Sequence, residues 1–349
     1  MPVYNGQKFL GAAIESILNQ TFTDFEFLIV DDLSTDVSVD IIKTYDDQRI
    51  RLYENYKNLG QAETMNRGLK LAKGKYIARM DQDDIAISLR LEKQVGYFKA
   101  HPNLGVLGTH VRIVDEARGT NAVRSRPRTN YENQWRLLYV TSVMHPSVMF
   151  RRGLFLKYGG YNNEYSPAED YEYWSRLSQF TEIHQLPDVL MKLRIHEANT
   201  SISNRSNQLK NTLKIRISNI NRLFAHQLES TGLKHIVDYI SGNYSSSPSW
   251  WLTVSSSMAS MYQLFCFDKV LTRDEVNWIA NDWIRLLKKM PLKYRIIVFT
   301  KFIALRTIVD YKYFRSMTLQ FKNILSQFSE GYKRKIFHPL STCWLILIN

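Results

Sequence analysis

Cysteine is nearly absent from this chain of 349 residues. Its two cysteines, Cys266 and Cys343, lie far apart in the sequence and show no metal-binding spacing. Two isolated cysteines exclude a disulfide framework and a cysteine-based zinc site. A chain with so few cysteines is typical of a reducing compartment, and we expect a cytoplasmic protein.

Long apolar runs are also lacking. The longest comprise four or five residues, at 296–299 and 344–348. A membrane-spanning helix needs about 20 such residues. The chain also opens without the pattern of a secretory leader. From these features we expect no spanning segment and a protein that remains inside the cell.

Charge is unevenly distributed. Residues 1–200 hold 25 Lys or Arg and 25 Asp or Glu, whereas residues 201–349 hold 21 and 8, so the net charge of +13 belongs to the second part. We predict two parts, residues 1–204 and a basic, mainly helical region at 205–349, with helices near 208–227, 250–267, 273–288 and 292–328. Residues 242–249, rich in Ser, are typical of a linker.

The first part alternates between helix and strand patterns. Apolar residues at helical spacing between Asn5 and Gln20 precede a short apolar strand at 25–30, and a second strand is predicted at 75–79. Alternation of this kind favours an α/β fold with a mostly parallel sheet covered by helices.

Acidic residues follow both predicted strands. Asp81 and Asp83 stand at the carboxyl end of the second strand, the edge where open α/β sheets bind ligands. Hard carboxylate oxygens in a small cluster suit Mg²⁺ or Mn²⁺ bound to a diphosphate. Asp31 and Asp32 end the first strand, where carboxylates can accept hydrogen bonds from a uracil N–H and ribose hydroxyls. For Ser34 and Asp36 we favour a simpler role, capping the next helix.

The order of these motifs resembles the family 2 glycosyltransferases with the GT-A fold. The motifs that carry this resemblance lie at residues 2–5, 16–21, 30–36, 58–60, 66–69, 74–78, 81–84, 90–94, 145–149, 159–161, 168–174, 193–196 and 199–201. Such enzymes transfer a sugar from a nucleotide diphosphate donor, commonly a UDP-sugar, with inversion. The resemblance is greatest to bacterial enzymes that build surface glycans such as lipopolysaccharide O-antigen, capsule or exopolysaccharide.

The resemblance implies roles for individual residues. A divalent ion would neutralise the charge that develops on the leaving UDP. By motif position, the base would be flanked by Tyr4, uracil bound by Asp32, the ribose or the metal shell contacted by Asp81, and the metal ligated by Asp83. His196 matches a position near the metal or the pyrophosphate, and Arg194, two residues earlier, would project to the same side and contact the nucleotide sugar.

The resemblance places the general base at Asp170. Locally, residues 166–169 have the pattern of a capping box with Pro167 at the first helical position, which predicts that Glu169 folds back onto the helix start. Asp170 then lies in the first turn, where the helix dipole favours its charged form. Without the resemblance, a dipole-complementing acid would be the preferred interpretation.

The arginine-rich segment 112–144 shows no hydrophobic period and predicts a mobile loop near the acceptor, with room to contact an anionic acceptor such as a lipid diphosphate. Residues 292–306 mix Lys and Arg with large apolar side chains, a composition typical of a helix in a membrane interface. We therefore expect an anionic membrane surface as partner and a peripheral position at the inner face of the cell membrane. Nucleic acid is not expected as a partner, since no nucleic-acid module is recognisable. A helical domain packed on the catalytic part, with a merely solvated basic face, is the remaining alternative.

The start of the chain departs from the family pattern, in which a full apolar strand precedes residues 2–5. We expect an incomplete first strand or a start that lies upstream. Two other functions stay open. A sugar-nucleotide nucleotidyltransferase also uses acidic metal ligands but normally opens with a Gly-rich phosphate loop, which this sequence lacks. A non-catalytic carbohydrate-binding protein would have little reason to combine Asp32, Asp83, Asp170 and His196.

Overall fold

The computed structural model describes residues 1–115, 117–197, 204–267, 269–291, 293–295 and 297–298. The chain forms two compact units, Met1–Ala225 and His226–Asn349. The boundary predicted from charge, after residue 204, differs from this division by one helix. The predicted helix at 292–328 lies almost entirely outside the described residues, and so does Cys343.

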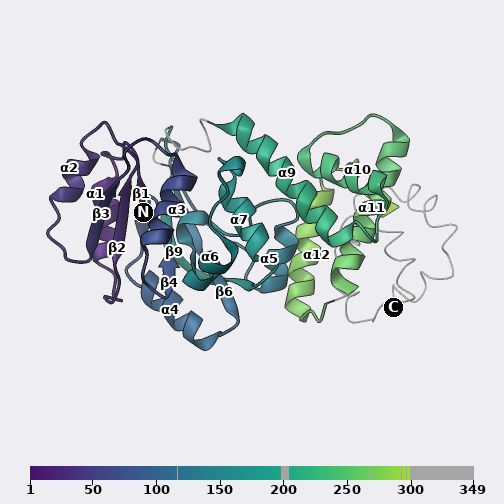
Figure 1. Cartoon of the computed structure of the whole chain (residues 1–349). Helices are drawn as coiled ribbons and strands as arrows, with labels where there is room; N and C mark the ends of the chain where they lie inside the picture. The colour runs from purple at the N-terminus through teal and green to yellow at the C-terminus, as the bar shows by residue number, and fades with distance from the viewer. Residues whose placement is uncertain (116, 198–203, 268, 292, 296, 299–349) are drawn as a thin grey trace. The chain divides into compact units, whose positions relative to one another are not determined.

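A three-stranded parallel sheet opens the first unit. Its strands are β1 (Pro2–Val3), β2 (Phe27–Asp31) and β3 (Ile50–Glu54), and β2 lies in the middle. Figure 1 shows these strands side by side with α1 (Leu10–Leu18) and α2 (Ser38–Lys43) beside them. The predicted helix within 5–20 is α1, and it buries Leu10, Ala13, Ile14 and Ile17.

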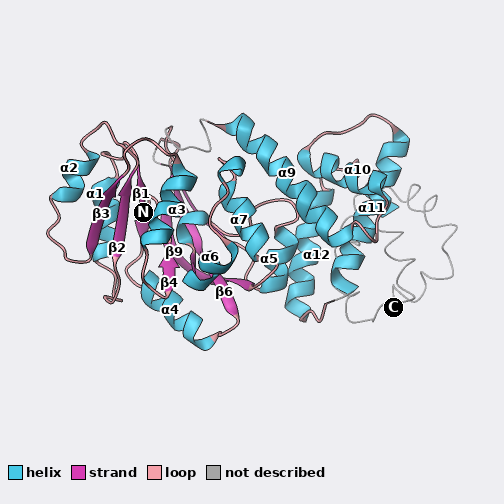
Figure 2. Ribbon diagram, viewed as in Figure 1, coloured by secondary structure: helices cyan, strands magenta, loops and turns pink. Residues whose placement is uncertain are grey.

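The second sheet has six strands and mixed pairing (Figure 2). The strands β6 and β9 pair in parallel, and the other pairings are antiparallel. The parallel sheet and covering helices confirm the predicted α/β class. The antiparallel pairings arise where the helix and strand alternation of the first 100 residues ends. The strands are β4 (Tyr76–Ala78), β5 (Ile85–Ala86), β6 (Leu104–Asp115), β7 (Thr120–Arg124), β8 (Met149–Arg151) and β9 (Glu182–Arg194).

Helices cover both sheets of the first unit. The predicted loop at 112–144 is wrong in part: it contains the end of β6, the strand β7, and a short helix closed by a capping box from Thr129 and Glu132. Pairing with the buried β6 orders β7, a strand that is exposed throughout and has no hydrophobic period of its own. The helices are α3 (Gln61–Leu71), α4 (Arg90–Ala100), α5 (Asn130–Arg136), α6 (Arg152–Tyr158), α7 (Glu169–Leu177) and α9 (Arg205–Phe224), with 3₁₀ turns at His145–Ser147 and Asn163–Tyr165.

A cavity of about 700 Å³ lies between the two sheets of the first unit. It is lined by β2 and β4, with α3 and α4 contributing apolar side chains. The α-ammonium of Met1 also lines it and donates a 2.8 Å hydrogen bond to the Leu28 carbonyl. Burial, reinforced by the Arg79 charge, lowers the pKa of this ammonium to about 5.

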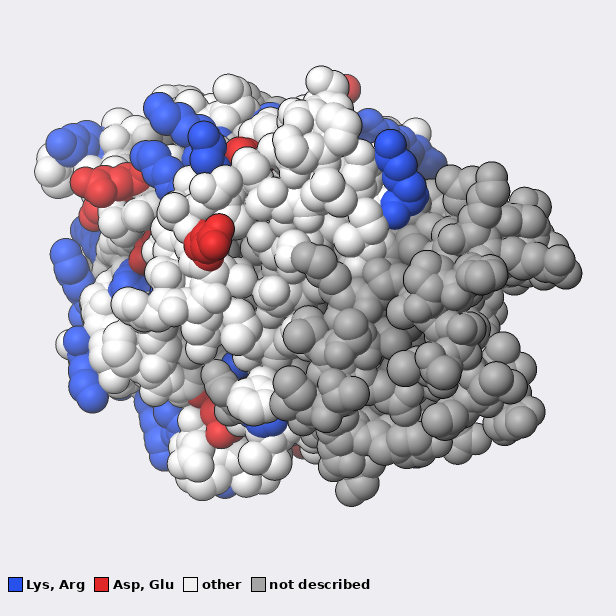
Figure 3. Space-filling view, turned by 90° about the vertical axis from the view of Figure 1, so that its right-hand side faces the viewer, with Lys and Arg blue, Asp and Glu red and all other residues white. Residues whose placement is uncertain are grey.

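The second unit is helical where it is described. It contains α10 (Ser230–Ser241), α11 (Pro248–Phe267) and α12 (Arg273–Leu287), so helices near 250–267 and 273–288 are confirmed and α10 was missed. Its core includes Trp251 and Trp283, and Thr272 and Glu275 form a capping box for α12. No helix among the described residues is long and apolar enough to cross a membrane. On the face shown in Figure 3, the Lys and Arg side chains are dispersed instead of forming one patch.

Candidate functional site

Three carboxylates gather just beyond the end of β4. Asp81, Asp83 and Asp84 each direct a ligating oxygen to one place, and these oxygens lie within 4.8 Å of one another. Among the described residues, this is the one group of His, Cys, Asp and Glu side chains arranged to hold a metal ion. Asp81 was expected to contact the ribose or the metal shell and Asp83 to ligate the metal, whereas no role was expected for Asp84. Asp84 was readable in the sequence only as a third acid in the same run.

Each carboxylate of this cluster has its own partner. Asp81 forms an ion pair with Arg79, and the Oδ2 atom of Asp83 lies 2.9 Å from the Nε2 atom of His196. Asp84 accepts a 3.0 Å hydrogen bond from the backbone N–H of Arg194. The long strand β9 ends at Arg194, beside β5, so the fold brings residues 194–196 to an acidic run more than 100 positions earlier.

Two carboxylates of the cluster, Asp83 and Asp84, resist ionisation. Burial raises the pKa of Asp83, and the Asp81 charge adds to this, while the bond to His196 acts in the opposite direction. Burial also raises the pKa of Asp84 well above its usual range, followed by the charges of Asp81 and Asp83. A cation among these oxygens would relieve both effects, since an opposite charge favours the ionised form. The donor set of carboxylate oxygens fits Mn²⁺ or Mg²⁺, and the imidazole of His196 lies beside it.

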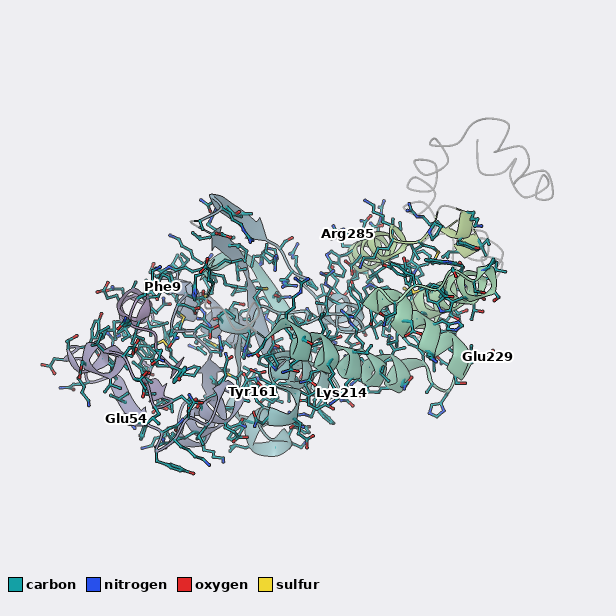
Figure 4. The ribbon with its side chains drawn as sticks, turned by 90° about the horizontal axis from the view of Figure 1, so that it is seen from above. Phe9, Glu54, Tyr161, Lys214, Glu229 and Arg285 are labelled. Carbon is teal, nitrogen blue, oxygen red and sulfur yellow. The ribbon has the colours of Figure 1, made fainter. Side chains whose placement is uncertain are left out.

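Phe9 lies against the partners of the cluster. Its ring centroid is 4.7 Å from that of His196, and the guanidinium carbon of Arg194 is 5.1 Å from the Phe9 ring centroid. Figure 4 labels Phe9 in the first unit. The side chain of Arg194 also donates a 3.3 Å hydrogen bond to the Asp83 carbonyl. Phe9 thus fixes the orientation of both side chains, a role that the sequence analysis missed because an aromatic residue before a helix has many uses.

Tyr4 is tied to the acidic run by its backbone. Its N–H donates a 2.8 Å hydrogen bond to the side chain of Gln82, which returns a 3.0 Å bond to the Tyr4 carbonyl. The side chain of Tyr4 is 47 % exposed, so its ring can be reached by a planar ligand. Its predicted position beside a base is compatible with this placement and stays a prediction.

Asp32 is buried and already has several hydrogen-bond donors. Its carboxylate accepts hydrogen bonds of 2.7, 2.7 and 2.8 Å from the Asn55 side chain and the N–H groups of Leu59 and Gly60. Gly60 has φ 80°, a left-handed conformation that favours glycine, so the loop before α3 takes one defined path. In this structure Asp32 orders that loop, and its contact with uracil stays a prediction. Asp31 accepts hydrogen bonds from the backbone and side chain of Ser34.

Asp170 occupies the first turn of α7, as predicted, but the capping box does not form. The helix begins at Glu169, its N-cap is Ala168, and no side chain caps it. The 166–167 peptide bond is cis, so Pro167 lies outside the helix and Ser166 is not at the N-cap. The expected capping role of Glu169 is therefore wrong.

The surroundings of Asp170 outweigh the helix dipole. Burial raises its pKa, and this is opposed by the Tyr171 N–H and by the charges of Arg79 and Arg126. Burial also raises the pKa of Glu169, to about 7, and the charge of Asp170 adds to this. A carboxylate held near two cations with a pKa above its usual range has the properties of a general base.

Arg79 connects the acidic cluster to Asp170. Its side chain is 5 % exposed, and its Nε and Nη2 atoms are buried without a hydrogen-bond partner among the described residues. Unsatisfied guanidinium N–H groups inside a protein are costly, and an anionic or hydroxyl-bearing ligand would satisfy them. The sequence analysis included Arg79 only as the end of a strand, because nothing in the sequence shows that its side chain is buried.

His145 and Tyr161 form a second buried pair, with the His145 Nε2 atom 3.0 Å from the Tyr161 hydroxyl. Burial lowers the pKa of His145 well below its usual range, so its imidazole is neutral. Tyr161, labelled in Figure 4, is held through its backbone by the side chain of Asn66 at 2.8 and 2.9 Å. The motif at residues 145–149 thus supports the loop that leads to Asp170.

The structure brings most predicted residues together. Asp81, Asp83, Arg194 and His196 share one cluster, and Tyr4 reaches it through Gln82. Asp170 interacts electrostatically with Asp81 and Arg79. Asp32 alone has contacts that point first to a structural role.

Comparison with known proteins identifies the type of the first unit. The sequence model described as "Glycosyl transferase family 2" matches residues 1–159. An uncharacterized glycosyltransferase of Methanocaldococcus jannaschii is 32% identical over 233 residues, covering 65% of this chain and 77% of that protein. The O-antigen biosynthesis glycosyltransferase WbnJ of Escherichia coli is 32% identical over 210 residues, covering 58% of this chain and 81% of that protein.

The fold has similar solved structures. S. aureus TarS 1–349 in complex with UDP-GlcNAc has a TM-score of 0.54 and 17% sequence identity, and the match covers 86% of this chain and 87% of that one. At this identity the likeness concerns the fold alone.

Proposed function

This chain belongs to glycosyl transferase family 2, and we propose that it transfers a sugar from a UDP-sugar, with inversion, to a hydroxyl of a glycan or lipid-linked glycan acceptor. The observation that supports this most is the cluster of Asp81, Asp83 and Asp84 at the sheet edge, backed by His196 and Arg194. It has the composition that a diphosphate with a divalent cation requires.

In this proposal Asp83 and His196 hold Mn²⁺ or Mg²⁺. When bound, the cation supplies the positive charge that offsets the diphosphate as it leaves. The short contact between Asp83 and His196 keeps both ligand atoms at one place. Asp81 contacts the ribose or the metal shell, with its carboxylate oriented by Arg79. Arg194, stacked on Phe9, contacts the nucleotide sugar.

The nucleotide would lie along the edge formed by the ends of β1 and β2. The exposed ring of Tyr4 flanks the base, and Asp32 faces uracil while it fixes the loop before α3. The UDP-sugar is inferred from the family's common donors, and a structural neighbour of the same fold binds UDP-GlcNAc.

Asp170 acts as the base. Its carboxylate takes the proton of the acceptor hydroxyl as that oxygen attacks the anomeric carbon. The bond from this carbon to the UDP oxygen breaks, and its electron pair leaves on the diphosphate. A single displacement of this kind inverts the anomeric configuration. Arg79 and Arg126 favour the ionised form of Asp170, which this step consumes.

The biological setting that we infer is bacterial surface polysaccharide synthesis, because relatives act in O-antigen and amylovoran biosynthesis. We place the protein in the cytoplasm, peripheral at the inner face of the membrane, with residues 1–204 as the nucleotide-sugar-binding domain and residues 205–349 as the basic helical region. Neither a nucleotidyltransferase nor a non-catalytic carbohydrate-binding protein is favoured by the family assignment.

A screen of UDP-sugars tests the proposal. UDP release from each sugar nucleotide is measured with Mn²⁺, with Mg²⁺ and with a chelator, using the full chain. We expect release from one or two UDP-sugars that stops when the chelator is present. Equal release in chelator would contradict the metal role, and release of pyrophosphate from a sugar phosphate and UTP would favour a nucleotidyltransferase.

The matched variants are Asp83→Asn and Asp188→Asn. The first removes a ligand charge from the cluster, and we expect metal-dependent UDP binding and transfer to be lost. Asp188 forms an ion pair with Lys93 away from the cluster, so its variant should behave as the parent does. UDP affinity that stays unchanged in Asp83→Asn with Mn²⁺ present would remove Asp83 from the metal site.

A further inference from the structure

Arginines are frequent in the segment 112–136, one of whose members, Arg126, acts electrostatically on Asp170. Residues 112–136 contain six arginines and three acids. Two of these acids serve elsewhere: Asp115 pairs with Arg118 at 3.8 Å, and Glu132 caps α5 by accepting from the backbone of Arg128. Among the described residues, no carboxylate lies within ion-pair distance of Arg124 or Arg126. Arg124 and Arg126 therefore keep positive charge that no ion pair among the described residues neutralises.

The side chain of Arg126 is partly buried. It donates a 3.4 Å hydrogen bond to the Thr141 carbonyl and contacts the sulfur of Met144. Its Nε atom is buried and has no hydrogen-bond partner among the described residues. Burial, together with the charges of Arg136 and Arg124, lowers the pKa of Arg126 to about 10. A guanidinium in this setting lacks an acceptor for at least one N–H group.

The neighbours of Arg126 converge on one region. Arg136 lies over the Tyr139 ring at 5.2 Å and donates to its hydroxyl at 3.2 Å. Arg124 ends the exposed strand β7 two residues before Arg126. The Asp170 carboxylate is close enough to Arg126 for each to favour the charged form of the other. Positive charge thus lies beside Asp170, which takes the proton of the acceptor hydroxyl in the proposed reaction.

We propose that Arg126, with Arg124 and Arg136, forms an acceptor subsite that binds a phosphate ester carried by the acceptor next to its reacting hydroxyl. The planar guanidinium fork matches two phosphate oxygens and supplies the acceptor for the buried Nε–H. A bound phosphate also reduces the electrostatic repulsion between the three arginines. This inference rests on the proposed function and adds the chemical class of the acceptor.

Binding of sn-glycerol 3-phosphate, compared with glycerol, tests the subsite. Both are titrated calorimetrically into the full chain saturated with UDP and Mn²⁺, so that the donor position is filled, at one fixed ionic strength. We expect the phosphate ester to bind and glycerol not to bind. Loss of one charge-assisted pair in Arg126→Gln should weaken binding about tenfold or more, with an intermediate loss in Arg126→Lys.

Arg118→Gln is the matched control. Arg118 belongs to the same hairpin but is 81 % exposed and pairs with Asp115, so its removal should leave the dissociation constant unchanged. If Arg126→Gln does not fold, Arg124→Gln replaces it, since this side chain is exposed, and a loss of about threefold is expected for a peripheral charge.

The inference would be overturned if glycerol bound as well as its phosphate, if the parent and the folded Arg126 or Arg124 variant had equal affinity, or if Arg118→Gln weakened binding equally. A parent that binds UDP with Mn²⁺ but not the phosphate ester would refute this subsite alone. A parent that binds the phosphate ester but no UDP would refute the proposed donor, so the two failures are distinguishable.

Discussion

Two adjacent acids at the start of α7 differ in their surroundings. Glu169 is 4 % exposed, and burial is the main cause of its raised pKa. Asp170 is only half-buried and interacts with Arg79 and Arg126, which hold down a pKa that burial raises. The more accessible acid, stabilised by cations, is the one that can meet an acceptor and take its proton.

Replacing the base should separate binding from turnover. We expect Asp170→Asn to bind UDP with Mn²⁺ as the parent does, while turnover falls by about 10²–10⁴-fold, the usual contribution of general base catalysis. Steady-state rates and UDP titrations measure the two properties. Glu172→Gln, in the same helix turn but paired with Arg176, is the control. Transfer at near-parent rates in Asp170→Asn would assign the base elsewhere.

Glu169 predicts a pH-dependent stability. Its pKa is raised from 4.5 to about 7 in the folded protein, so the folded state holds a proton that the unfolded state has lost. This contribution is fully present below pH 4.5 and is lost as pH rises through 7. The Glu169→Gln side chain cannot ionise, so the variant avoids this loss. We expect the difference in free energy of unfolding, variant minus parent, to be about 2 kcal/mol larger at pH 8 than at pH 5.

Urea denaturation at pH 5 and pH 8 measures this difference, with Glu164→Gln as the control because Glu164 is exposed in the preceding turn. Relative to the parent, Glu169→Gln should gain free energy of unfolding when the pH is raised. If the variant instead gained free energy of unfolding relative to the parent when the pH is lowered, Glu169 would be ionised and stabilising in the folded protein.

At the scale of elements, the sequence predicted the strand ends, since apolar runs followed by acids are a local signal. It predicted Asp81, Asp83 and Asp170 in the right elements. It could not predict the partners Arg79 and Phe9, because burial of one and stacking of the other depend on segments far away in the sequence. The 112–144 segment was misread for a related reason: β7 is fully exposed and is ordered only by pairing with β6.

The loop before α3 depends on Asp32. Its carboxylate accepts from the partly buried N–H groups of Leu59 and Gly60 and from the buried Asn55 side chain, and Asp32→Ala would remove this acceptor from all three donors. We expect the free energy of unfolding of the nucleotide-free protein to fall by about 2–4 kcal/mol. Chemical denaturation without UDP measures this loss. Asp24→Ala, at an exposed position, should cost far less. A loss of UDP binding at unchanged stability would instead make Asp32 a pure ligand residue.

At the scale of the whole molecule, the net charge of +13 arises after residue 200. Residues 292–306 interleave basic and apolar side chains, and most of them lie outside the described part of the structure. The membrane role of this stretch therefore stays a prediction from sequence. Anionic lipid contributes about 1 kcal/mol for each basic residue near its surface, so a few such residues would hold the protein there.

Vesicle sedimentation tests this prediction. We expect the protein to sediment with vesicles that contain anionic lipid, not with neutral ones, and less so at high salt because surface charges are screened beyond about 8–10 Å. Replacing Lys293, Arg295, Lys301 and Arg306 by Gln should release it while UDP binding stays unchanged. If this variant sediments as the parent does, the stretch is not the membrane contact. If it unfolds, these residues belong to the packing of the helical unit.

The cavity between β2 and β4 has a mechanical consequence for the first unit. Hydrostatic pressure favours states of smaller volume, and the internal volume removed on unfolding sets how strongly pressure acts. The cavity of about 700 Å³, lined by both sheets and partly open to solvent, is space that closer packing of the two sheets would remove. Under compression, the strand ends that present Asp32 on one side and Asp81 on the other should shift relative to each other before the surrounding helices yield.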